Sequence, residues 1–314
     1  MSSATPAVAS AVDSAAALER PPITVTVATI QGWPEIRDAI MSVAVSTRQA
    51  GGELVVTDGS GLPAPSPEET GSGVRWLSFP GESTFQLRAR AYSVAQGELV
   101  AITEDHVSVP LDWAERHVAA HRAHPEAQAI GGSVENAATG NVMDWASFLV
   151  VQAAVMAPIK SGPARRLSGA VNVSYTRSAL ADLDDFEGMG AMDGLHQGKL
   201  AAGGGALRND DSIRGRHDQS LGCGGTTASH YHAGRTMSGF RRQHMTVVDG
   251  LRIVGALVVP LARYARLVVL HQRRGSGGLV ARCTPAILWL LYSQGLGQFV
   301  GYVRGPGDSP RKVQ

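Results

Sequence analysis

The first half of the chain alternates β-branched runs with apolar positions at helical spacing. Residues 23–29, Ile-Thr-Val-Thr-Val-Ala-Thr, have the composition of a strand. Ile36, Ile40 and Val43 then recur at helical spacing, and Gly51-Gly52 ends that helix. Further strands are expected at 53–57, 74–78 and 99–102, and further helices at 87–95 and 112–124. The pattern predicts an α/β fold.

Strands that alternate with helices in this way form a mostly parallel sheet with helices on both faces. Ligands of such sheets bind beyond the carboxyl ends of the strands. The residues directly after the strands are therefore where chemistry is expected: Thr29-Ile30-Gln31, Asp58-Gly59-Ser60 and Glu104-Asp105-His106. Farther along, the pattern predicts a helix at 141–157, a strand at 167–175 and a helix at 191–202.

The C-terminal segment differs in kind from the rest of the chain. Pro285–Val303 contains 19 residues and no charge, about the length of an apolar helix that spans a bilayer. Leu251–Leu270 is also apolar but includes three arginines, which suits a helix in the membrane interface. We expect residues 246–314 to form hydrophobic helices associated with a membrane surface. The alternative, that both segments are core helices of the main domain, stays open.

The N-terminal 20 residues are rich in alanine and serine, with neither a basic start nor a continuous apolar run. This is not the pattern of a signal peptide. We expect residues 1–20 to be a disordered tail. The domain that follows, residues 21–245, is expected on the cytoplasmic side of the membrane.

Composition and charge exclude several classes of protein. Apolar residues make up 44% of the 314 residues, which is enough for a sizeable core. The formal net charge is only +1, from 28 basic and 27 acidic residues, so no overall field favours nucleic acid as a partner. Cys223 and Cys283 lie far apart, which fits a reducing compartment and disfavours a cysteine-ligated zinc.

Four segments share their order and spacing with a known family. Residues 25–29 form an apolar strand ending in Ala-Thr, and 53–60 form one ending in Asp-Gly-Ser. Residues 90–113 hold an acidic triplet followed by Pro-Leu-Asp-Trp, and 169–175 contain Gly-x-x-Asn. Over roughly Ile23–Arg242 the chain resembles the family 2 glycosyltransferases, and its C-terminal segment looks like the hydrophobic tails of some members. The resemblance implies a GT-A-type nucleotide-binding sandwich.

The resemblance also implies an activity. Family members transfer a sugar from a nucleotide-diphosphate sugar to an acceptor hydroxyl, and inversion of the anomeric centre is inherited from the resemblance. The Gln-x-x-Arg-Trp motif of processive members is absent, and His230-Tyr231-His232 stands in that neighbourhood. We therefore prefer transfer of a single sugar. The acceptor, whether a glycan, a lipid or a small molecule, is left open by the sequence.

On the donor side, the resemblance assigns Thr29 and Asp58 to the nucleotide. Glu104, Asp105 and His106 stand where the family commonly has three aspartates that hold a divalent cation against the diphosphate. Residues two apart in an extended segment point to one face, so Glu104 and His106 would share the ion while Asp105 reaches the ribose or the metal. Histidine in this place favours Mn²⁺ over Mg²⁺. The alternative is a solvated turn with a surface histidine.

On the acceptor side, Asp193 matches an acidic family position and is the candidate general base. Its alternative is an ordinary aspartate at a helix N-terminus, which the macrodipole favours. Glu187 and His196 are the next candidates. His217 resembles a histidine that many members carry after their last strand, so it is a candidate ligand of the metal or the diphosphate, with an ordinary core or surface histidine as the alternative.

Two rival functions belong to other classes. Two acidic positions of the family are altered: His106 replaces a carboxylate of the triplet, and Met192-Asp193 stands where the family has a Glu-Asp pair. The main rival is therefore a nucleotide-sugar-binding protein that has lost catalysis. A membrane scaffold is a further rival and would bind no nucleotide. A zinc site at His230 and His232 is excluded because third and fourth ligands at a recognisable spacing are missing.

Overall fold

A computed structural model gives the fold for residues 20–181, 190–242, 245, 247–255 and 258–313. The expected N-terminal tail lies outside these residues, apart from Arg20, and so does Glu187.

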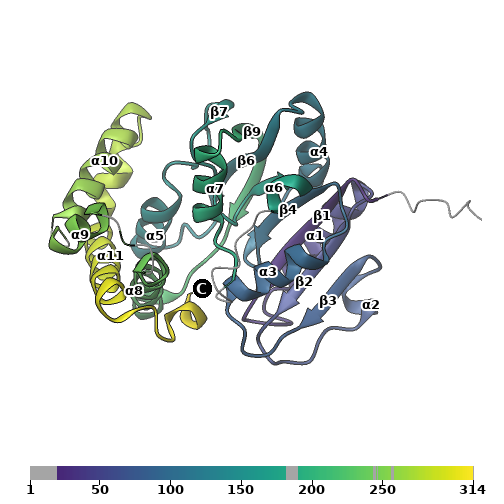
Figure 1. The fold of residues 1–314 in the computed structure, drawn as a ribbon, viewed down its shortest axis with the longest axis horizontal. Helices are drawn as coiled ribbons and strands as arrows, with labels where there is room; N and C mark the ends of the chain where they lie inside the picture. The colour runs from purple at the N-terminus through teal and green to yellow at the C-terminus, as the bar shows by residue number, and fades with distance from the viewer. Residues whose placement is uncertain (1–19, 182–189, 243–244, 246, 256–257, 314) are drawn as a thin grey trace, which may run out of the picture.

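A mixed sheet forms the centre of the molecule (Figure 1). Its strand order is β3-β2-β1-β4-β8-β6-β9-β5, with β7 paired to β9. The strands are β1 (Ile23–Thr29), β2 (Glu53–Asp58), β3 (Val74–Ser78), β4 (Leu99–Glu104), β5 (Val107–Ser108), β6 (Ala127–Asn136), β7 (Gly162–Ala164), β8 (Val173–Thr176) and β9 (Ala206–His217).

The first four strands follow the sequence prediction. β3, β2, β1 and β4 run parallel. Thr29 lies opposite Asp58 and Ala28 lies opposite Glu104. The register therefore brings the carboxyl ends of β1, β2 and β4 to one edge of the sheet, where ligands of parallel strands bind.

The second half of the sheet corrects the prediction of a mostly parallel sheet. β8 lies between β4 and β6 and runs antiparallel to both, and β9 is parallel to β6 but antiparallel to β5 and β7. Antiparallel neighbours need no helical crossover between them. The helix between β6 and β8, α5 (Val142–Gln152), packs both on the C-terminal helix α11 and on the sheet, where Phe148 shares a core with Val107 and Val134.

Helices cover the two faces of the parallel half, because alternate residues of each strand point to opposite faces. Val25, Val27 and Val56 share a core with α1 (Arg37–Gln49) and α4 (Trp113–Ala123). Thr57 points the other way, and its hydroxyl donates to the Leu87 carbonyl of α3 (Thr84–Val94) at 3.0 Å. The short helices α2 (Pro67–Thr70) and α6 (Arg177–Ala181) and the longer α7 (Asp193–Ala202) complete this part.

The C-terminal helices form a layer at one end of the longest axis of the molecule (Figure 1). This layer consists of α8 (Gly222–Arg241), α9 (Val247–Val254), α10 (Val259–Arg273), α11 (Gly277–Arg304) and the 3₁₀ helix η3 (Ser309–Lys312). Leu267 of α10 and Ile287 and Leu290 of α11 share a buried core with Ala146 and Leu149 of α5. The C-terminal helices are therefore packed on the rest of the protein.

The membrane-spanning length expected for Pro285–Val303 is corrected. Within the described residues, no helix has both the length and the apolarity that crossing a membrane requires. The apolar run forms the greater part of α11, and its glycines serve packing. A Cβ on Gly297 would meet the Tyr231 carbonyl of α8, and one on Gly301 would meet the Arg235 carbonyl. Glycine thus lets the backbones of α8 and α11 approach closely.

Candidate metal and donor site

The site lies where β4 ends and the chain turns into β5. Glu104 is the last residue of β4, and Asp105 and His106 form the turn that follows. Val107 of β5 pairs with His217, the last residue of β9. This pairing brings His217 to His106 although 111 residues separate them, and their Nε2 atoms lie 3.0 Å apart.

Glu104, His106 and His217 offer one ligand atom each within 4.8 Å of one another. The Glu104 Oε2 atom is 3.4 Å from the Nε2 atom of His106 and 3.8 Å from that of His217. Two ligands bound at about 2.1 Å and at right angles on one ion stand about 3 Å apart. The three donors therefore fit a single divalent cation, and the two imidazoles suit Mn²⁺ better than Mg²⁺.

Asp105 holds His106 from behind rather than joining the three donors. Its Oδ1 lies 2.8 Å from the Nδ1 atom of His106, and the carboxylate is buried. A carboxylate that accepts from one ring nitrogen fixes the tautomer and aims the other nitrogen at the metal position. The expected position of Asp105 on the opposite face, reaching the ribose, differs from this geometry because residues 105–106 form a turn instead of extended backbone.

Protonation of the cluster is strongly coupled. Burial alone would lower the pKa of His106, but hydrogen bonds to Asp105 and Glu104 raise it to about 10. Burial would likewise raise the pKa of Glu104, but the hydrogen bond and charge of His106 lower it to about 2. Burial and the neighbouring charge of His106 lower the pKa of His217 to about 4. Without a metal, the protonated ring of His106 therefore supplies the positive charge between Glu104 and Asp105. A metal bound at Nε2 of His106 would displace the proton from that nitrogen.

Arg88 of α3 is a site residue that the sequence analysis missed. Its guanidinium donates to Glu104 Oε1 at 3.1 Å and lies 3.8 Å from Asp193 Oδ2. It stands between Phe85, Leu87 and Ala91, which are buried on the inward side of α3. A basic residue on the apolar face of a predicted helix is the signal that would have identified it.

Asp193, the predicted base, is the first residue of α7 and is only 4% exposed. The hydroxyls of Tyr92 and Tyr175 donate to its Oδ1 at 3.2 and 3.3 Å. Burial, with the charge of Asp193, raises the pKa of both tyrosines well above the usual value, so they stay neutral donors. His196 is buried on the same helix, with its ring 5.4 Å from that of Tyr175.

Thr29 and Asp58 are buried at the ends of β1 and β2, where they shape turns. The Thr29 hydroxyl accepts from the backbone N–H groups of Gln31 and Gly32 at 3.1 and 3.3 Å. Asp58 accepts from the Ser60 N–H at 2.7 Å and from the Trp76 indole at 3.2 Å. Both residues thus stand at the predicted edge of the sheet, and the hydrogen bonds found for them are internal.

A cavity of about 120 Å³ opens beside the cluster. Its described lining combines the end of β1, the start of α3, the β4 turn and the C-terminal segment: Ala28, Ile30, Gln31, Thr84, Phe85, Arg88, Glu104, Asp105, His106 and Val313. The cavity is smaller than the 300 Å³ or more of ordinary ligand pockets. Val313 of the C-terminal segment belongs to this lining and packs beside Phe85 and Phe240.

The other histidines of the C-terminal half lie in different contacts. His230 bonds the Ser147 hydroxyl at 3.0 Å, and His232 bonds the Ser309 hydroxyl at 3.0 Å. Among the described residues, the group of three or more candidate metal ligands is Glu104, His106 and His217.

The fold defined by these elements is a glycosyltransferase-like α/β fold. A solved structure with this fold is the mannosyltransferase PcManGT from Pyrobaculum calidifontis, in complex with GDP-Man and Mn²⁺. It aligns with a TM-score of 0.56 at 15% sequence identity, over 91% of this chain and 88% of that chain. No protein-family profile matches the chain, and no curated protein matches its sequence. At this identity the likeness concerns the fold.

Proposed function

We propose that the protein is a GT-A-type glycosyltransferase that moves a single sugar from a nucleotide-diphosphate sugar to an acceptor hydroxyl with inversion. One observation carries the proposal: Glu104, His106 and His217 meet at the carboxyl edge of the sheet in a glycosyltransferase-like fold. The neighbour of known structure holds GDP-Man and Mn²⁺ in the same kind of fold, which supports a nucleotide sugar and a divalent cation as ligands.

Each residue of the cluster has a proposed role on the donor side. Glu104, His106 and His217 would hold Mn²⁺ or, less favourably, Mg²⁺. When bound, the cation offsets the negative charge of the leaving diphosphate. Asp105 keeps the His106 ring in the ligating orientation, as its 2.8 Å contact with Nδ1 indicates. Thr29 and Asp58 are proposed to border the nucleoside, since their turns form the adjacent edge of the sheet.

The acceptor side is proposed to centre on Asp193. Inversion by a single displacement needs a base that takes the proton of the acceptor hydroxyl. Asp193 is linked to the cluster through Arg88, which contacts both Glu104 and Asp193. Tyr92 and Tyr175 both donate to Oδ1, so Oδ2, which lies 3.8 Å from Arg88, is the oxygen proposed to take the proton.

A nucleotide-sugar-binding protein without catalysis is the second candidate. The burial of Asp193 favours this candidate, because an acceptor hydroxyl has little access to a carboxylate that is only 4% exposed. Both candidates bind the same donor, so turnover separates them.

Thermal unfolding with a panel of nucleotide sugars, with and without Mn²⁺, tests the proposal. A donor at about 100 times its Kd stabilises the folded state by about 2.7 kcal/mol. We expect one nucleotide sugar to raise the Tm, with a larger shift in Mn²⁺ and slow release of the nucleoside diphosphate. The Mn²⁺ effect should disappear in His217→Ala and persist in the control His124→Ala, whose histidine pairs with Glu126.

The same measurements contain the outcomes that would count against the proposal. If every nucleotide sugar leaves the Tm unchanged, both the glycosyltransferase and the nucleotide-sugar-binding protein are ruled out as functions. If a donor shifts the Tm but no diphosphate is released in Mn²⁺, the binding protein is the better description. An Mn²⁺ effect that persists in His217→Ala would remove this histidine from the ligand set.

A further inference from the structure

The outward face of α11 is apolar over residues 289–303. Large apolar side chains recur there at steps of three and four residues, which places them on one face of a helix. They are Trp289, Tyr292, Leu296, Phe299 and Val303, with exposed fractions between 38% and 59%. We call these five residues the α11 stripe.

The inward face of α11 is apolar as well. Ile287, Leu290 and Leu291 are buried in the core shared with α5 and α10. A surface helix of a water-soluble domain carries polar residues on its outer side. In α11 the residues 285–303 include no charge at all, so its outer side is suited to an apolar environment.

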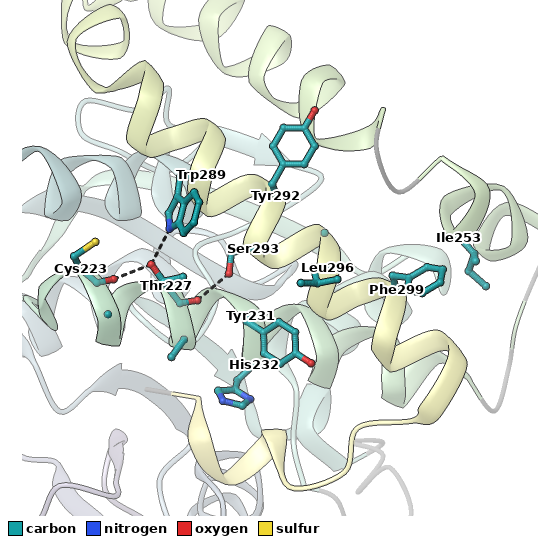
Figure 2. A pocket seen from close by; sticks show the side chains of 13 residues that line it. Cys223, Thr227, Tyr231, His232, Ile253, Trp289, Tyr292, Ser293, Leu296 and Phe299 are labelled. Atoms are coloured by element: carbon teal, nitrogen blue, oxygen red, sulfur yellow. Dashed lines mark hydrogen bonds between the residues drawn. The ribbon is translucent and has the colours of Figure 1, made fainter.

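A wide groove runs beside the stripe, between α8 and α11 (Figure 2). Its volume is about 1110 Å³, and Ile253 of α9 stands near Phe299 at one end. The polar groups in the groove bond one another: the Trp289 indole donates to the Thr227 hydroxyl at 2.9 Å, and the Ser293 hydroxyl donates to the Thr227 carbonyl at 2.9 Å. These bonds turn polar atoms inward and leave an apolar surface toward the solvent.

Charge is divided unevenly along the chain. Residues 222–314 contain 12 basic and 2 acidic side chains, whereas residues 1–221 contain 16 basic and 25 acidic ones. The C-terminal part therefore carries a formal charge of +10 in a protein whose net charge is +1. Arg282 and Arg304 stand at the two ends of the stripe, and Arg266 and Arg273 are exposed on the neighbouring α10.

We propose that the α11 stripe and its flanking arginines dock on the surface of an anionic phospholipid bilayer, with α11 lying in the plane of the interface. Apolar side chains enter the boundary between headgroups and acyl chains, and arginines bind the anionic headgroups. Tryptophan and tyrosine suit this depth because they combine an apolar ring with a polar atom. A bilayer meets both the apolar and the cationic requirement of this face.

A second copy of the chain fits the same face less well. A two-fold dimer through the stripe would bring two layers of charge +10 together, and like charges across an interface oppose association. The bilayer proposal also goes beyond glycosyl transfer and does not depend on it.

The test is flotation of the full chain with vesicles of neutral phosphatidylcholine or of the same lipid with about 30 mol% phosphatidylserine. We expect binding to the anionic vesicles to exceed binding to the neutral ones at least about tenfold, and to weaken as salt is added. Leu296→Glu with Phe299→Glu should reduce anionic binding at least about tenfold, because two charges enter the stripe. Leu62→Glu with Leu111→Glu is the matched control, since both leucines are exposed on the sheet domain.

Every outcome bears on the proposal. Arg266→Gln with Arg273→Gln leaves the stripe intact and should weaken anionic binding on its own, which covers the case in which the glutamate variant misfolds. Equal binding of wild-type and stripe variant, or equal binding to both vesicle types, overturns the proposal. The proposal is also overturned if light scattering shows a wild-type dimer that the stripe variant does not form, and if the wild-type protein binds no vesicles. Donor-induced Tm shifts, measured on the same variants, should stay unchanged and keep this test separate from glycosyl transfer.

Discussion

At the residue scale, the proposed catalytic role of Asp193 conflicts with its buried position in the structure. A general base needs access to its substrate, whereas this carboxylate accepts from Tyr92 and Tyr175 and faces Arg88. Both tyrosines donate to Oδ1, so a chemical role for Asp193 requires the acceptor to reach Oδ2, which lies 3.8 Å from Arg88.

Asp193→Asn separates the catalytic role from the structural one. Asn keeps the size but cannot accept a proton, so we expect the turnover number to fall by about 10²–10⁴. Donor affinity, measured calorimetrically on the same preparation, should be nearly unchanged, because a base does not hold the donor.

Tyr92→Phe is the control for this prediction. It removes one hydrogen bond to Asp193, at a cost of about 1 kcal/mol, and leaves the carboxylate in place. Normal transfer by Asp193→Asn, together with a loss of Tm much larger than that of the control, would show that Asp193 only anchors Arg88.

The predictability of the site also differs from residue to residue. The strand-end position and the spacing of Glu104 and His106 predicted that their side chains lie together, and the Glu104 Oε2 and His106 Nε2 atoms are 3.4 Å apart. His217 was named only from a resemblance, since the β5–β9 pairing that brings it to His106 spans 111 residues. Arg88 was missed because only apolar residues were used to identify the buried face of the helix. An arginine is expected on such a face only when it has acidic partners, and those of Arg88, Glu104 and Asp193, lie far from it in the sequence.

At the scale of elements, α8 shows how packing overrides local propensity. Its 20 residues include five glycines, which disfavour a helix. Two of them are placed where α11 and the C-terminal segment approach: a Cβ on Gly234 would meet the Gln294 carbonyl, and one on Gly239 would meet Pro306. The apolar residues of 222–241 show no helical periodicity that predicts α8. The helix that it packs against, α11, lies about 60 residues farther along the chain.

Gly297→Ala tests that close approach. The added Cβ would collide with the backbone of Tyr231, so we expect the free energy of unfolding to fall by about 1–3 kcal/mol, measured by urea denaturation. Gly278→Ala is the matched control in the same helix, because nothing lies within 4 Å of its added Cβ. The control should be neutral or stabilise by up to about 1 kcal/mol. Equal effects of the two substitutions would mean that α8 and α11 are not closely packed.

Strand direction was the other failure at this scale. The alternation of residues 167–175 predicts a strand, and β8, at Val173–Thr176, overlaps only the end of that range. A two-residue period carries no information on whether neighbours run parallel or antiparallel. The parallel order of β1, β2 and β4 was predictable because a helix that packs on the sheet follows β1 and another precedes β4.

At the scale of the whole molecule, the domain boundary at residue 245 is the open prediction. Truncation after Val248 removes Leu267, Ile287 and Leu290, which bury Ala146 and Leu149 of α5. We expect the shortened chain to aggregate, because several core side chains lose their cover at about 1.5–3 kcal/mol each. Sedimentation and donor-induced Tm shifts check this. A truncated chain that stays soluble and binds the donor would establish residues 246–314 as an independent segment.

The uneven division of charge makes the protein an electric dipole despite its net charge of +1. The cationic helices α10 and α11 lie toward one end of the longest axis (Figure 1). Opposite forces on the two ends rotate such a molecule before it touches a charged surface, within about 8 Å at physiological ionic strength. The positive end would thus turn toward an anionic surface in advance of contact. The orientation of the protein relative to the surface would then be largely determined before contact. A protein without such a dipole reaches the correct orientation only through repeated random collisions.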